Sequence, residues 1–284
     1  MGPISIIRFR YALRVFAMSR SLLLPFLLAA LLGLAACSDE EPEYVERPVD
    51  ELYNEAMDMM EVRNYAGAAA AFEEVDRQHP YSVWATKAQL MLAYVYYRSD
   101  EYDEAIIALD RFIDLHPGNR DVAYAYYLRA ICYYEQIVDV GRDQKITQLA
   151  LDSLRDVTRR FPNSEYSRDA NLKIDLTMDH LAGKEMLIGR FYQRREEHLA
   201  AINRFNAVIK NYETTTHVPE ALHRLVESYY ALGIRPEAER TAAVLGYNFP
   251  GSDWYAYSYA LLEGKNLDQP EEDSWLSWTW SWIF

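Results

Sequence analysis

Apolar positions recur along most of the chain with the spacing of one face of an α-helix. An alanine is followed by a larger apolar residue four positions later, by another at seven, and by a proline at twelve. The fourth copy has Glu213 in place of the proline, and the fifth has Ala242 in place of the first large residue. Positions four and seven apart lie on one helical face, and the proline ends the helix. The five alanines are Ala68, Ala105, Ala150, Ala201 and Ala238.

A second apolar helix precedes each of these helices. Its mark is a mostly small residue followed three positions later by a larger one, usually tyrosine, as in Ala93 and Tyr96 or Gly189 and Tyr192. A small residue lets two helices approach, and the aromatic residue covers the contact. The paired pattern resembles the tetratricopeptide signature, whose period is about 34 residues. We therefore predict an all-α fold over residues 49–264, a superhelical solenoid of five tetratricopeptide-like helical hairpins.

Two stretches make the predicted repeats longer than this consensus. Residues 139–147 form an insertion within the third copy, and residues 166–180 precede the fourth. The second stretch contains neither glycine nor proline, so we expect it to extend the first helix of repeat four into one long helix.

The first helices of such hairpins line a concave groove. Helical register, counted from the small residue, places a set of aromatic, methionine and basic side chains in this groove. Tyrosine offers contact area and a hydroxyl at low entropic cost, which suits extended peptides, and Lys87 and Arg98 could receive a peptide's terminal carboxylate. Tyrosines at the position of Tyr96 are expected to pack between hairpins instead. The groove candidates are Tyr53, Met57, Met60, Lys87, Tyr94, Tyr97, Arg98, Tyr124, Tyr127 and Tyr134.

The N-terminus has the pattern of an export signal. Arginines precede an apolar run that ends in LAAC at Cys37, and this run is shorter than the roughly 20 residues that span a bilayer. We predict a lipoprotein signal peptide over residues 1–36, lipidation of Cys37, and an acidic tether over residues 37–48. Met18 begins a complete signal by itself, so translation from Met18 is an alternative to Met1. Lipidation would leave Cys132 without a partner, and we expect it to be a small buried hydrophobe.

Charge and motif content exclude several function classes. The net charge is −14, although residues 1–36 contain four arginines and no acid, so the remainder is still more acidic. Such a chain repels nucleic acid, and we expect no nucleic-acid partner. The histidines show no paired-ligand spacing, and there is no P-loop, GxSxG or CxxC motif. We therefore expect a binding protein with no enzymatic activity, cofactor or metal.

Four segments of the second half carry a closer resemblance. Residues 181–186 (LAGKEM), 189–192 (GRFY), 201–205 (AINRF) and 242–250 (AAVLGYNFP), followed by Trp254, resemble the BamD family of tetratricopeptide lipoproteins, particularly its alphaproteobacterial branch. The resemblance implies a subunit of the outer-membrane β-barrel assembly machinery, held by its lipid anchor at the periplasmic face of the outer membrane. Ser38 after the lipidated cysteine is similar to the sorting signal of outer-membrane lipoproteins.

The same resemblance implies the partners. In that family the N-terminal repeats receive the C-terminal β-signal of unfolded outer-membrane proteins. The C-terminal repeats dock on the POTRA modules of BamA, within a complex that holds other lipoproteins. The implied docking surface lies around His217, Arg224, Arg235 and Trp254.

The last stretch, residues 265–284, is acidic and then rich in tryptophan. As a helix it would place Trp275, Trp278 and Trp282 on one face, which suits a membrane interface and is the interpretation we favour. As a strand ending in Phe284 it is similar to a β-signal, and we hypothesise that it occupies the protein's own groove or a neighbour's.

Two other functions remain open at this point. One is another tetratricopeptide lipoprotein of the envelope, such as a pilotin or a peptidoglycan-linked, Tol-associated scaffold. The other is an enzyme on a helical scaffold, such as a lytic transglycosylase, although the repeats leave no room for a separate catalytic domain.

Overall fold

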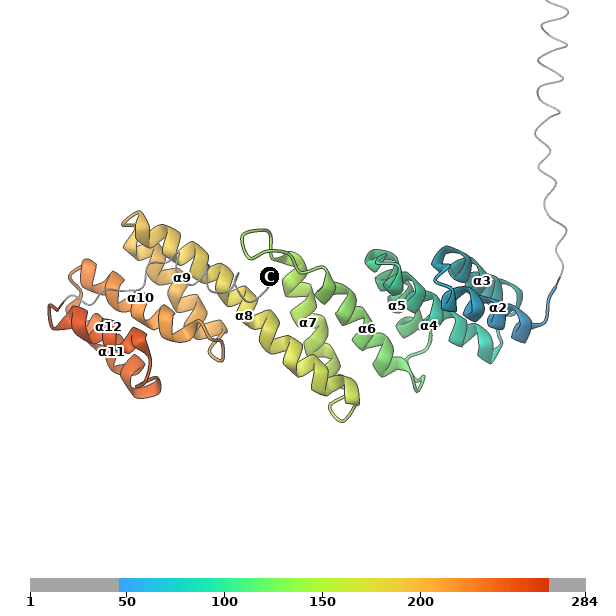
Figure 1. Ribbon diagram of the computed structural model, residues 1–284. Helices are drawn as coiled ribbons and strands as arrows, with labels where there is room; N and C mark the ends of the chain where they lie inside the picture. The colour runs from blue at the N-terminus through green and yellow to red at the C-terminus, as the bar shows by residue number, and fades with distance from the viewer. Residues whose placement is uncertain (1–45, 266–284) are drawn as a thin grey trace, which may run out of the picture. The chain divides into compact units, whose positions relative to one another are not determined.

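The computed structural model describes residues 46–265, and all regular secondary structure in this range is α-helical (Figure 1). The helices pair into five hairpins, followed by a single helix α12 (Asp253–Leu262). The predicted solenoid of five helical hairpins is thereby confirmed. The predicted signal peptide, Cys37, most of the tether and the tail from residue 266 lie outside the described residues. The hairpins are α2 (Val49–Glu61) with α3 (Tyr65–Gln78), α4 (Val83–Arg98) with α5 (Tyr102–Leu115), α6 (Val122–Glu135) with α7 (Lys145–Arg160), α8 (Glu165–Arg194) with α9 (His198–Asn211), and α10 (Val218–Ala231) with α11 (Arg235–Asn248).

The first helices of the hairpins form one layer and the second helices another. Each helix packs on the helices before and after it, and each first helix also touches the next first helix, from α2 with α4 through to α8 with α10. Second helices of successive hairpins do not pack directly on one another within residues 46–265. We call the surface formed by the first helices the inner face and that formed by the second helices the outer face.

The periodic residues of the sequence form the core. All five recurring alanines are fully buried, as are Leu109, Leu154 and Phe205, which follow them by four positions. Helix ends match the sequence too: α3, α5, α7 and α11 each end two residues before a proline. Proline lacks an N–H and disfavours helical geometry in the preceding residue, so it stops the helix locally.

Four of the five hairpin turns share one backbone conformation. A residue two positions before the second helix adopts a positive φ: 60° at Arg63, 63° at Asp100, 61° at Glu196 and 74° at Gly233. The next amide then donates to a carbonyl five residues back, for example Glu101 to Tyr96 at 2.9 Å. A left-handed residue at this place ends the first helix and reverses the chain. The third hairpin lacks it because a longer loop joins α6 to α7.

Two further expectations are confirmed. Helix α8 continues without a break through residues 166–180 and is 30 residues long. Cys132 is free and fully buried, and burial raises the pKa of its thiol to about 12. Within the described range, none of the helices combines the length and apolar character needed to cross a bilayer.

Candidate functional site

The inner face begins with an open hollow of about 740 Å³ at the junction of the first three hairpins. Tyr53 reaches it from α2, where its ring lies 5.5 Å from Phe72 and 4.9 Å from Trp84. Lys87 extends over the Trp84 ring at 4.9 Å. Its walls are thus aromatic and aliphatic with cations at the rim, a mixture typical of ligand clefts. The lining residues are Tyr53, Val83, Thr86, Lys87, Leu90, Met91, Phe112, Asn119, Arg120 and Asp121.

The two cations expected to share a carboxylate lie apart. Arg98 is eleven residues after Lys87 on α4, which places it about 16 Å farther along the helix axis. Its guanidinium donates to the hydroxyls of Tyr94 at 3.0 Å and Tyr65 at 3.4 Å. The second cation of the hollow is instead Arg120, whose ion-pair partner within residues 46–265 is the adjacent Asp121 at 3.4 Å. Lys87 and Arg120, rather than Lys87 and Arg98, therefore share one site.

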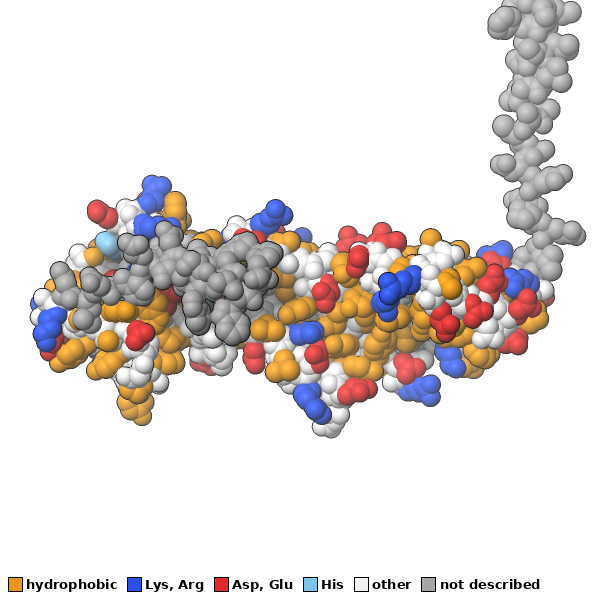
Figure 2. Space-filling model, in the orientation of Figure 1, with side chains coloured by type: hydrophobic (Ala, Val, Ile, Leu, Met, Phe, Trp, Pro, Cys, Tyr) orange, Lys and Arg blue, Asp and Glu red, His pale blue; other side chains and the backbone are white. Residues whose placement is uncertain are grey.

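A run of tyrosines continues along the inner face from α4 to α8. The rings of Tyr94 and Tyr97 lie 6.2 Å apart. Farther on, Tyr124 and Tyr127 of α6 both contact Tyr166 of α8, at 5.6 and 5.2 Å. These side chains are half-buried, so they pack between helices along one edge and face solvent along the other. In Figure 2, hydrophobic side chains, tyrosine included, gather over α6 with charged side chains around them.

The tyrosine hydroxyls are fixed as neutral hydrogen-bonding groups. Burial raises the pKa of Tyr124 and of Tyr127, and the Tyr127 hydroxyl also donates to Asp169 at 2.6 Å, which raises its pKa further. Burial likewise raises the pKa of Tyr53 and of Tyr97. Phenols with raised pKa values stay protonated at neutral pH. Tyr127 already gives its one proton to Asp169, so its oxygen can only accept from a bound chain, whereas Tyr53, Tyr97 and Tyr124 keep a proton to donate.

The last groove candidate on α6 borders a smaller hollow. Tyr134 lies under the ammonium of Lys173 at 5.0 Å and lines a space of about 270 Å³ together with Leu176 and His180 of α8. Met57 and Met60, by contrast, are half-buried against the core of the first hairpin and lie outside both of these hollows. The inner face thus presents two separate depressions joined by the tyrosine run.

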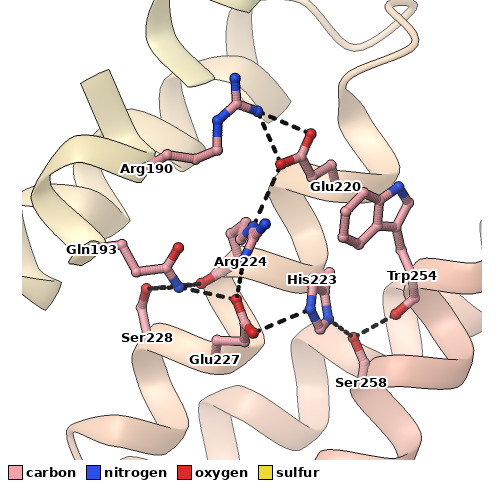
Figure 3. Close-up of polar contacts among 9 residues, drawn as sticks. All are labelled: Arg190, Gln193, Glu220, His223, Arg224, Glu227, Ser228, Trp254 and Ser258. Carbon is pink, nitrogen blue, oxygen red and sulfur yellow. Dashed lines mark hydrogen bonds and ion pairs between the residues drawn. The ribbon is translucent and has the colours of Figure 1, made fainter. Parts of the chain in front are cut away.

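Two of the predicted docking residues, Arg224 and Trp254, belong to a dense polar network (Figure 3). Glu220 accepts from Arg190 of α8 at 3.0 Å and from Arg224 at 3.4 Å. Arg224 also pairs with Glu227 at 3.1 Å and lies over the Trp254 ring at 5.6 Å. The arginine and glutamate side chains are at most 20% exposed. The guanidinium of Arg224 is therefore already satisfied within the chain.

A buried histidine extends this network to the last helix. His223 is fully buried, shares a 2.8 Å hydrogen bond with Ser258 of α12, and lies 3.3 Å from Glu227. Ser258 in turn donates to the Trp254 carbonyl at 2.9 Å. The network thereby ties α8, α10 and α12 together.

The four predicted docking residues lie in three places rather than one. Only Arg224 and Trp254 are in contact. His217 stands at the start of α10, 3.6 Å from Asp179 of α8. Arg235 lies over the Tyr230 ring at 5.7 Å and donates to the Leu262 carbonyl at 2.9 Å. A partner that touches all four would have to cover the whole end of the stack.

Comparison with known proteins identifies the family. The model of the YfiO family, described as outer membrane lipoproteins, matches residues 45–245. The outer membrane protein assembly factor BamD of Caulobacter vibrioides is 54% identical over 79% of this chain and 73% of its own. The chain belongs to the BamD family. BamD of Rickettsia prowazekii is 48% identical over 85% of this chain and 96% of its own, and BamD of Neisseria meningitidis serogroup A is 33% identical over 88% and 97%.

Membership of the BamD family confirms the resemblance drawn from the repeat-four and repeat-five segments. It also favours outer-membrane assembly over the pilotin and Tol-associated alternatives. Sequence reasoning on this BamD-family chain missed Trp84, Arg120 and Tyr166 among the inner-face residues. Trp84 could have been found, because it lies one turn before Lys87 on the same helical face. Arg120 and Tyr166 reach the site from a turn and from the extended part of α8, which repeat spacing does not locate.

Proposed function

We propose that this chain is a lipid-anchored subunit of the outer-membrane β-barrel assembly machinery, held at the periplasmic face of the outer membrane through Cys37. Its inner face in repeats one to three binds the C-terminal segments of unfolded outer-membrane proteins. Its C-terminal repeats dock on the POTRA modules of BamA. Membership of the BamD family is the observation that carries this proposal, and the aromatic hollow with two cations gives it a physical basis.

The first hollow suits the end of a β-signal. Such a segment ends in an aromatic residue and a free carboxylate, and it is extended before it joins a barrel. An aromatic side chain would enter between Tyr53 and the aliphatic wall formed by Leu90 and Met91. Its carboxylate would meet the exposed charges of Lys87 and Arg120, which makes charge-assisted hydrogen bonds available. The tyrosine run then offers hydroxyls to the backbone of the preceding residues.

The role proposed is that of a scaffold rather than an enzyme. Its inner face offers phenols together with the cations Lys87 and Arg120, groups that can bind and orient an extended chain. At the other end, the polar network holds α8, α10 and α12 in one arrangement. A surface fixed in advance loses little conformational entropy when a partner docks.

The substrate assignment can be tested with labelled peptides. A decapeptide ending in phenylalanine, with either a free or an amidated C-terminus, is titrated with the mature chain by fluorescence anisotropy. Lys87→Gln and Arg120→Gln should each weaken binding of the free-acid peptide about two- to five-fold, the range for exposed charge pairs. Both variants should leave the amidated peptide unchanged. Lys145→Gln, an exposed charge on α7 outside the hollow, is the matched control.

Equal losses for the two peptides would contradict a carboxylate site in this hollow. No binding of either peptide at millimolar concentration would contradict the substrate role itself. The complex can be tested separately, by purifying the lipoprotein in mild detergent. Recovery without a large β-barrel partner would refute the assembly role.

A further inference from the structure

A second hollow, of about 420 Å³, lies on the outer face between the first two hairpins. We call it the outer hollow. On α4 it is lined by Gln89, Leu92 and Tyr96, whereas the inner hollow is lined by α4 residues of the turns around Lys87 and Leu90. At 100° per residue these two sets lie on roughly opposite sides of the helix. The lining residues are Phe72, Glu73, Asp76, Arg77, Gln89, Leu92, Tyr96, Glu104, Ile107, Ala108, Arg111 and Phe112.

The outer hollow has an apolar floor and an exposed aliphatic residue at its edge. Phe72 and Phe112 are almost fully buried and close it from below. Ile107 of α5 is 69% exposed at its mouth. A single exposed isoleucine is ordinary on a protein surface, but one that borders a hollow with an aromatic floor is placed to contact an inserted side chain.

The rim carries a surplus of negative charge. Both guanidinium groups are already paired: Arg111 with Asp76 at 3.3 Å, and Arg77 with Glu74 at 2.5 Å. The other carboxylates of the lining are Glu73 and Glu104. No ion pair is recorded for either within residues 46–265.

The hydrogen bond of Tyr96 and its raised pKa agree with a surplus of negative charge at the rim. The Tyr96 hydroxyl donates to the Glu73 carboxylate at 3.1 Å. Burial raises the pKa of Tyr96 to about 12, and the charge of Glu73 contributes to the rise. A carboxylate neutralised by a nearby cation would have a weaker effect on the phenol.

We propose that the outer hollow docks a segment of a partner protein in which one bulky aliphatic side chain is flanked by lysine or arginine. The aliphatic group would fill the space above Phe72 and Phe112, and the flanking cations would meet Glu73 and Glu104. The negative rim disfavours nucleic acid, anionic lipid and acidic peptides. The two hollows open on opposite sides of α4 and share only the buried Phe112, so the chain could hold this partner and an unfolded client together.

The test uses the mature chain with isotope-labelled isoleucine and leucine methyl groups. The probe is a nine-residue glycine–serine peptide with a central leucine between two lysines, and the comparison peptide has glutamates instead. The lysine peptide should shift the methyl signals of Ile107 and Leu92, and the glutamate peptide should not. The double variant Glu73→Gln with Glu104→Gln should weaken binding of the lysine peptide about three- to tenfold, because it removes two partly screened charge pairs.

A matched pair of variants distinguishes binding in the outer hollow from nonspecific binding to an exposed apolar side chain. Ile107→Ser should weaken the lysine peptide at least about fivefold, as expected for loss of one apolar contact. Leu199→Ser on α9, where the side chain is 68% exposed, should have no effect. Because Ile107 lies on the outer face, its variant should also bind β-signal peptides normally, whether or not the substrate proposal holds.

Three results would overturn the inference. The first is that the lysine peptide produces no shifts at millimolar concentration. The second is that both peptides shift Ile107 equally and the double glutamine variant changes neither. The third is that Ile107 signals move with protein concentration alone, which would make a second copy of this chain the occupant.

Discussion

The close packing of α8 on α9 at Gly189 predicts a coupled pair of substitutions. Gly189 of α8 faces the ring of Phe205 of α9, which is fully buried. A Cβ added at residue 189 would lie 2.4, 2.8 and 2.9 Å from three ring carbons. Carbon atoms in contact normally stay 3.5–4.0 Å apart, so the ring would have to move by about 1 Å within a filled core.

The magnitude follows from two opposing effects. Overpacking of this kind costs about 1–3 kcal/mol, while replacing glycine by alanine inside a helix stabilises it by about 0.5–1 kcal/mol. Gly189→Ala should therefore lower the free energy of unfolding by up to about 2.5 kcal/mol. Phe205→Leu alone should lower it by about 1–2 kcal/mol through the cavity it leaves. In the double variant the smaller side chain makes room for the methyl group, so the loss should be at least about 1 kcal/mol less than the sum.

Urea unfolding of the mature chain, followed by circular dichroism at 222 nm, measures all four free energies. Gly118→Ala is the control, because an added Cβ there meets nothing within 4 Å. Its effect should stay within about 0.5 kcal/mol. Strict additivity of the two core substitutions, or a Gly189→Ala variant more stable than the parent, would refute the packing argument.

Three further predictions concern charge and backbone geometry. Since the pKa of Tyr96 is raised to about 12 in the folded chain from 10.0, its contribution to stability is complete below pH 10 and is lost as the pH rises towards 12. Tyr96→Phe should flatten the decline of urea midpoints across that range, and an unchanged decline would contradict it. Glu220→Ala leaves two mostly buried guanidinium groups short of a carboxylate and should destabilise the chain by about 1–3 kcal/mol. Glu239→Ala, in a pair about 60% exposed on both sides, should change stability by less than about 1 kcal/mol in the same assay. Gly233→Ala should cost about 1–2 kcal/mol because φ is 74° at that turn, and a neutral result in thermal unfolding would argue against the left-handed geometry.

The part of the fold that sequence could predict is the part set by local rules. The periodic alanines and the residues four positions after them are buried because helical spacing alone puts them on one face. Prolines stop α3, α5, α7 and α11 for reasons contained in two or three residues. The long α8 was predictable on the same grounds, since residues 166–180 contain no helix breaker.

The site could be predicted only in outline, because its details depend on contacts between distant segments. Tyr53 and Lys87, both expected in the groove, line one hollow, but register did not show that Arg98 donates to Tyr65 of α3, 33 positions earlier in the chain. Arg224 pairs with Glu220 and Glu227 one turn away on its own helix, a spacing that the sequence contains, whereas its contact with the Trp254 ring of α12 joins distant segments and was out of reach. The outer hollow escaped prediction for a related reason: it exists because α3 and α5 do not pack directly on each other.

The half-buried state of the inner-face tyrosines bears on how a client would bind. A fully exposed ring would offer more area but would lose rotamer freedom on binding. Tyr127 is instead already held, by its stacking on Tyr166 and by its hydrogen bond to Asp169. Arg98 is fixed in the same way between two phenols. An extended client would therefore meet ordered ring edges at little entropic cost to the protein.

Because those edges are similar along the whole run, they would favour any extended aromatic-rich chain and discriminate weakly among sequences. Selection of a particular chain end would then depend on the first hollow, where Lys87 and Arg120 supply the charges that a carboxylate requires.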